Sequence, residues 1–126
     1  MEGFVNISFV NKVQDQTIIV LDNKNLVIHK VTNAKNANLN FVVQSEHPLK
    51  IPIGTPVVIT YDRKLNKDEK FNVILHFSTT ELSSAIQWVD KENTISKVNK
   101  FMYMQCEPIL CRTFFPSQVQ IEFKNI

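Results

Sequence analysis

The chain has 126 residues, of which 44% are hydrophobic, and a formal net charge of +2. This length predicts one domain, residues 1–126, with a single core. So small a charge gives no strong field that would favour a nucleic acid or an anionic membrane, and we expect neither as a partner. The apolar runs are a few residues long, far short of the roughly 20 residues that span a bilayer.

The N-terminus and the cysteines bear on the compartment. Residues 1–6 carry an acid and no basic segment, so the sequence predicts no secretory signal. Cys106 and Cys111, in a chain without such a leader, are predicted to be free thiols that pack as small buried hydrophobes. We therefore expect a cytoplasmic protein. With only two glycines, Gly3 and Gly54, a Gly-rich phosphate-binding loop is excluded.

Period-two alternation of apolar and polar residues predicts β-strands in the first half of the chain. The expected strands cover residues 5–10, 17–21, 26–32 and 39–44, with turns rich in Asn and Asp between them. In the third strand we expect Leu26 and Ile28 on one face and Val27 and Val31 on the other. A further short edge strand is expected at Lys50-Ile51, in a loop punctuated by prolines.

The second half of the chain shows the same period. The expected strands cover residues 57–61, 70–78, 84–89, 101–106 and 119–123, with a charged turn at 62–70 and a polar loop at 90–99. Residues 109–115 are ambiguous and fit one short helical turn. Because no segment has sustained helical spacing, the predicted fold class is all-β. We expect a mainly antiparallel β-sandwich or a saddle-like curved sheet of eight or nine short strands.

Metal and nucleophile chemistry are not indicated. His29, His47 and His76 lie far apart in the sequence, and no His-Glu-x-x-His or paired Cys-x-x-Cys motif occurs. We therefore predict no metal site, no cofactor and no catalytic residue in this chain. A carboxylate next to Cys106 opposes thiolate formation.

That carboxylate, Glu107, lies within an apolar run and directly before Pro108. Burying an unpaired carboxylate costs several kcal/mol. Two alternatives follow. Glu107 is turned to solvent at a strand end, or it is held in place for a ligand.

Two segments, Ser83–Trp88 and Met104–Pro116, carry a resemblance to a known family. The first holds the one tryptophan, and the second contains Gln-Cys-Glu, an arginine and Phe-Phe-Pro. This order resembles the N-terminal β-domain of the M1 zinc aminopeptidases, in the leukotriene A4 hydrolase-like branch. The segment Asn25–Val31 also resembles a strand of that branch.

The resemblance implies a role for two residues in substrate binding. Glu107 occupies the position that reaches into the active site and binds the free α-amine of the substrate, and Gln105 occupies the preceding glutamine position. An ammonium group entering a partly dry cleft pairs well with an anion. The resemblance further implies that zinc is held by a separate catalytic domain of the same enzyme, which is an aminopeptidase or an epoxide hydrolase. The isolated chain is then expected to be inactive.

The sequence departs from the family pattern at several points. Pro108 stands where the family has alanine, the loop after Pro116 is shortened, and an upstream strand, the zinc motif and the exopeptidase motif are missing, as in a truncated protein. An alternative is therefore a stand-alone β-sandwich module that binds a peptide or protein partner at an unpaired sheet edge. A lectin-like module is disfavoured, because Trp88 is expected to pack inside the apolar segment.

Overall fold

The computed structural model describes residues 1–45, 54–107 and 109–117. Within them the strands are β1 (Glu2–Val10), β2 (Gln16–Asn23), β3 (Leu26–Asn33), β4 (Asn40–Val43), β5 (Thr55–Leu65), β6 (Lys70–Thr79), β7 (Ile86–Val89) and β8 (Phe101–Met104). Two short 3-10 turns, η1 (Lys91–Asn93) and η2 (Leu110–Thr113), complete the elements, and η2 matches the predicted helical turn. The all-β fold class is confirmed. The strands predicted at Lys50-Ile51 and at 119–123, together with His47 and Pro108, lie outside the described residues.

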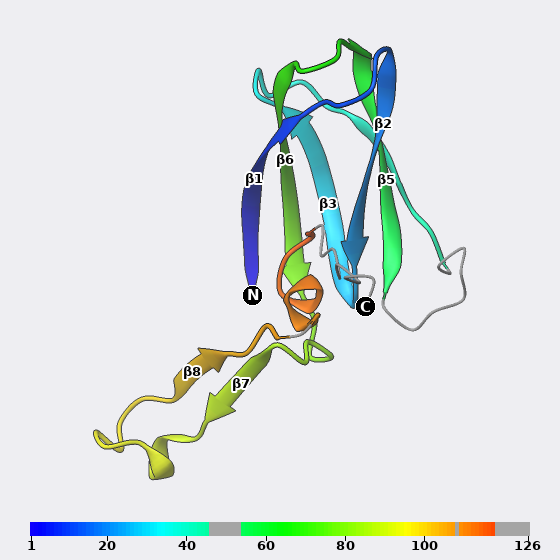
Figure 1. Cartoon of the computed structure of the whole chain (residues 1–126). Coiled ribbons are helices and arrows are strands. Elements are labelled where there is room, and N and C mark those ends of the chain that lie inside the picture. Colours follow the sequence, from blue (N-terminus) through cyan, green and yellow to red (C-terminus); the bar gives the residue numbers. More distant parts are fainter. Residues whose placement is uncertain (46–53, 108, 118–126) are drawn as a thin grey trace, which may run out of the picture.

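Six strands form two antiparallel sheets that pack face to face (Figure 1). Sheet A has the order β1-β6-β3 and sheet B the order β2-β5-β4. Inward side chains of both sheets make one core, whose buried members are Ile19, Leu21, Val31, Leu39, Val57, Ile59, Tyr61, Leu65, Phe71, Val73 and Leu75. Burial of a side chain of this kind contributes about 1.5–3 kcal/mol.

Strand β6 is the centre of sheet A, and its alternation was the clearest in the sequence. Phe71, Val73, Leu75 and Phe77 are buried, while the residues between them are half-buried. The Phe71 ring stacks on the Phe9 ring of β1, and it contacts the Tyr61 ring of β5 in an edge-to-face arrangement. The ring centroids are 5.2 Å apart in each pair. These contacts join sheets A and B, and they confirm the predicted faces of this strand.

In β3, Leu26 and Ile28 share a face opposite Val27 as predicted, but the predicted face of Val31 is wrong. Ile28 pairs with Phe77 and Lys30 pairs with His76, so His29 is an extra residue in the ladder. Such a bulge inverts the alternation that follows it. Val31 therefore joins Leu26 and Ile28 on the core side and is 1% exposed.

Strand β5 continues four residues beyond its predicted end, through part of the segment expected to be a charged turn. Its last residue, Leu65, is fully buried in the core, which holds the strand extended. The Arg63 guanidinium lies over the Tyr61 ring and forms an ion pair with Glu69 across the turn. The hydrogen bond from Arg63 and a second one from the Asn66 N–H lower the pKa of the Glu69 carboxyl.

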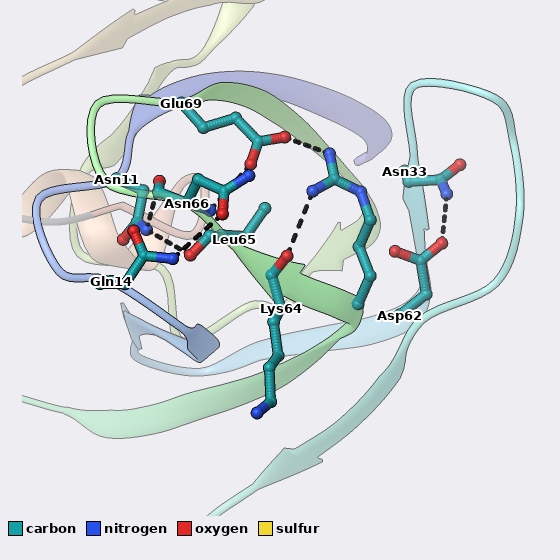
Figure 2. A network of polar contacts seen from close by, with 9 residues as sticks. Asn11, Gln14, Asn33, Asp62, Lys64, Leu65, Asn66 and Glu69 are labelled. Atoms are coloured by element: carbon teal, nitrogen blue, oxygen red, sulfur yellow. Dashed lines mark hydrogen bonds and ion pairs between the residues drawn. The ribbon is translucent and has the colours of Figure 1, made fainter.

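A buried amide joins the turn after β1 to the turn between β5 and β6 (Figure 2). The Asn11 Nδ2 group donates to the carbonyls of Leu65 at 3.0 Å and Asn66 at 2.8 Å. The backbone N–H of Asn11 donates to the Glu69 carbonyl at 2.9 Å. The Asn11 side chain thus satisfies backbone acceptors that lie where regular pairing ends.

We expect Asn11→Ala to lower the free energy of unfolding by about 1–3 kcal/mol, because it leaves buried carbonyls without a donor. Urea denaturation measures this, with the exposed neighbour Lys12→Ala as the control. Equal effects of the two substitutions would contradict the role given to the Asn11 amide.

Candidate functional site

Strands β7 and β8 form a two-stranded ribbon that projects from the sandwich (Figure 1). Ile86 pairs with Met104 and Val89 pairs with Phe101. Gln105 follows the last residue of β8, and its N–H donates to the Ala85 carbonyl at 3.0 Å. The predicted substrate-binding segment therefore begins at the base of the ribbon, beside the sandwich.

Gln105 and Glu107 both lie on the surface. After Gln105 the chain folds back, because the Leu110 N–H donates to the Cys106 carbonyl at 2.7 Å, and then enters η2. We call residues 105–107 and 109–110 the site turn. Of the two alternatives for Glu107, its exposed position fits the solvent-facing one, and this also leaves the carboxylate accessible to a ligand. Binding of an amine at Glu107 stays a prediction.

The two cysteines close the site turn, which corrects the expectation of free, buried thiols. Cys106 and Cys111 form a disulfide, with their Cα atoms 4.5 Å apart, and both residues are half-buried. The fold-back at Leu110 brings the two positions together, a proximity that the sequence spacing did not reveal. Because disulfides are rare in cytosolic proteins, the bond also removes the cysteine-based support for a cytoplasmic location, which stays a prediction.

We expect a thiol titration of the unfolded, unreduced chain to detect no reactive thiol, and to detect both cysteines after reduction. Removing the bond with the Cys106→Ser/Cys111→Ser pair of substitutions should lower the free energy of unfolding by about 2 kcal/mol, since the closed loop is short. Two reactive thiols before reduction would contradict the bond.

A buried arginine fixes the site turn to sheet B. The Arg112 side chain is 2% exposed, and its Nη1 lies 3.5 Å from a carboxylate oxygen of Asp22 in β2. Its Nε donates to the Ile109 carbonyl at 3.1 Å. The Arg112 carbonyl in turn accepts from the Lys24 N–H at 2.9 Å. Buried charges are tolerated where they are paired and hydrogen-bonded in this way.

Thr113, next to Arg112, fixes the base of the ribbon. The Thr113 Oγ1 accepts from the Ala85 N–H at 3.0 Å and donates to the Leu110 carbonyl at 2.7 Å. The Ser83 hydroxyl donates to the Thr113 carbonyl at 2.7 Å. Because Ala85 also accepts from the Gln105 N–H, the β7 entry, the β8 exit and η2 form one hydrogen-bonded unit.

We expect Arg112→Ala to lower the free energy of unfolding by about 3 kcal/mol, because it leaves Asp22 unpaired and opens a buried space. Calorimetry or urea denaturation would measure the change. The control is Lys100→Ala, which breaks an exposed ion pair with Asp90 at 3.0 Å. The hydrogen bond to Asp90 raises the pKa of Lys100, but a solvated pair contributes little to stability. An Arg112→Ala effect no larger than the control would contradict the structural role of Arg112.

The ribbon and its connecting loop expose large apolar side chains, which corrects the expectation that Trp88 is packed. We define the hairpin surface by Trp88, Ile95, Val98, Phe101, Tyr103 and Met104, all at least 45% exposed. Cross-strand pairing places Trp88 with Met102 on one face of the ribbon, and Tyr103 and Phe101 on the other. The aromatics therefore form no single platform of the kind a lectin-like site would need. Large apolar side chains exposed together on one small element indicate an interaction site.

No group of three or more His, Cys, Asp or Glu side chains is placed to hold a metal ion among the described residues. The exposed His29 ring instead contacts the Ser78 hydroxyl at 2.6 Å on the outer face of sheet A. The described part of the chain also has no helix with the length and hydrophobicity of a membrane span.

Comparisons with known proteins match most of this chain to a small part of larger enzymes. Leukotriene A-4 hydrolase of Xenopus laevis is 35% identical over 111 residues, which are 86% of this chain and 17% of the hydrolase. Leucine aminopeptidase 2-2 of Meyerozyma guilliermondii is 35% identical over 107 residues, covering 85% of this chain and 16% of the aminopeptidase. The structure of native yeast LTA4 hydrolase superposes with a TM-score of 0.77 at 22% identity, over 92% of this chain and 17% of that one. No protein-family model matches the chain.

Proposed function

In sequence and in fold the chain resembles the N-terminal β-domain of the M1 zinc peptidases, in the leukotriene A4 hydrolase-like branch, and from this premise we propose its function. The domain covers one side of the substrate cleft of a larger peptidase and binds the amino terminus of the substrate there. The reaction class is that of an aminopeptidase, with the epoxide hydrolysis of a leukotriene A4 hydrolase as the related possibility within the same branch.

The observation that carries this proposal is the position of Glu107. The residue that the resemblance assigns to amine binding lies exposed on the site turn. The Cys106–Cys111 bond closes that turn, and the ion pair of Arg112 with Asp22 holds it against the sandwich. A carboxylate on a fixed turn pairs with an ammonium group at a low cost in side-chain and backbone ordering. Gln105 lies at the start of the same turn and offers an amide as a second polar contact.

The hairpin surface supports the placement of the domain within a larger enzyme. Exposed apolar side chains on both faces of a two-stranded ribbon are what a domain presents where a further domain covers it. The matched relatives are several times longer than this chain, which spans 17% of the leukotriene A-4 hydrolase. We propose that the catalytic domain of the same enzyme covers the ribbon and brings Glu107 to the cleft.

In this proposal zinc belongs to the catalytic domain and not to this chain. The described residues fit no metal site, so no catalytic step is assigned to them. The role of the chain is to bind and orient a cationic amine and to form one side of the substrate cleft. Alone, it is proposed to have no peptidase activity, and its proposed location is the cytoplasm.

The test is Glu107→Ala in a fusion of this chain with the catalytic part of a leukotriene A4 hydrolase. The substitution should lower kcat/KM for peptides with a free amino terminus by roughly tenfold to a hundredfold, the effect of losing a hydrogen bond to a charged group. Peptides with an acetylated amino terminus should be affected little.

The matched control is Glu92→Ala, which removes another exposed glutamate, in η1 near the tip of the ribbon. It should leave kcat/KM unchanged for both kinds of peptide. An equal loss for free and acetylated peptides, or no loss with Glu107→Ala, would contradict amine binding by Glu107.

A further inference from the structure

The Cys106–Cys111 bond encloses the residue to which the proposed function assigns amine binding. Glu107 lies between the two cysteines in the sequence, and the Cα atoms of the cysteines are 4.5 Å apart. Among the described residues, Glu107 has no hydrogen-bond or ion-pair partner of its own. The placement of its carboxylate therefore depends on how the backbone on either side of it is closed.

The site turn is anchored at both ends by contacts that do not involve the bond. At its start, the Gln105 N–H donates to the Ala85 carbonyl at 3.0 Å. After its end, the buried Arg112 forms its ion pair with Asp22 of β2. Breaking the disulfide leaves both anchors in place, and it loosens the segment between them, which carries Glu107.

The bond is open to chemical reduction. Both cysteines are half-buried, and neither belongs to the core between the two sheets. In the proposed function the site turn lines a substrate cleft, so small solutes reach it when no substrate is bound. Because the loop that the bond closes is short, the bond adds little to the stability of the folded chain. Reduction is therefore expected without unfolding.

The proposed location of the chain favours a bond that is made and broken. Disulfides are rare in cytosolic proteins, and those that form there are usually transient, with a catalytic or a redox-sensing role. The sequence holds two cysteines, so neither has an alternative partner within the chain. The bond is thus either closed or open, and these two states differ at Glu107.

We propose that the Cys106–Cys111 bond is a redox switch of the candidate site. The closed bond holds Glu107 in place for the substrate amine, and reduction releases it and weakens amine binding. This inference goes beyond the proposed function in naming a regulation, and its functional part rests on that function.

The co-reactant of the switch is a dithiol. One thiolate of the dithiol attacks a sulfur of the bond and displaces the other sulfur as a thiolate. The second thiol of the reductant then attacks the mixed disulfide and releases the first sulfur. Two electrons and two protons pass to the cysteines, the dithiol becomes a disulfide, and the reverse exchange closes the bond again.

The first test is a redox titration of the full chain with mixtures of dithiothreitol and its oxidised form. Alkylation followed by mass spectrometry measures the fraction of reduced cysteines, and circular dichroism measures folding. Both thiols should appear together, in a single two-electron transition, while the chain stays folded. A bond that is reduced only where the chain unfolds would overturn the proposal.

Backbone NMR relaxation of the full chain measures the order of the site turn directly. The order parameters of the Glu107 and Ile109 amides should fall on reduction, whereas that of the Ala85 amide should stay unchanged. The chain with Cys106→Ser/Cys111→Ser should match the reduced wild type with or without the dithiol. Equal order parameters of the Glu107 amide in the two redox states would overturn the proposal.

The third test uses the fusion of this chain with the catalytic part of a leukotriene A4 hydrolase. Reduction should lower kcat/KM for peptides with a free amino terminus roughly threefold to tenfold, the effect of having to order one or two mobile groups on binding. Acetylated peptides should be affected little. The fusion with Cys106→Ser/Cys111→Ser should have the lower value in both states, which controls for effects of the dithiol on zinc. A wild-type fusion that responds no more than this control would overturn the proposal.

The Glu107→Ala fusion separates failure of the switch from failure of the proposed function. Reduction should cause no further loss in this variant, since the carboxylate that it releases is absent. An equal loss on reduction with and without Glu107 would place the effect elsewhere and overturn the switch. If Glu107→Ala alone causes no loss, the proposed function fails, and the order parameters then decide the switch by themselves.

Discussion

The contact between the buried Arg112 guanidinium and Asp22 is the interaction on which the placement of the candidate site depends. The ribbon has two strands, and an isolated pair of strands is marginally stable in water. Its position is fixed at the base, where Arg112 reaches sheet B and Thr113 bonds to Ala85. Without these contacts Glu107 would lie on a loop of many conformations, and binding there would first have to order it.

The sandwich provides the stability of the domain, and the ribbon provides the surface for recognition. The sandwich buries one continuous core between its two sheets, and Asn11 satisfies carbonyls at its far end. The ribbon contributes little to that core and exposes Trp88, Phe101 and Tyr103. This arrangement fits a domain that folds around its own core and presents an apolar surface, with a carboxylate at its root, to a larger enzyme.

Sequence patterns were sufficient where one face of a strand is buried. The alternation of Phe71, Val73, Leu75 and Phe77 predicted β6, since a shift of one residue would expose them all. The same pattern failed at His29, because a bulge inverts the faces and leaves no local signal. The pattern also predicted burial of the ribbon, because an apolar strand that lies on the surface has the same residue pattern as one that faces the core.

The site was predictable in part, and for a different reason. Gln105 and Glu107 were identified through resemblance, and burial arguments alone left Glu107 with two alternatives. The Cys106–Cys111 bond depends on the fold-back at Leu110, which spacing alone does not predict. The ion-pair partner of Arg112 is Asp22, which lies ninety residues earlier in the chain. A pairing of that range comes from the assembled sheets and not from any local pattern.

The central claim is that this domain acts as part of a larger zinc peptidase. The measurement that tests it most directly is the mass of the native polypeptide that carries the domain, by immunoblot with an antibody against the sandwich. The account predicts a band far heavier than the 14.6 kDa of this chain. A band at the mass of the chain itself would contradict it.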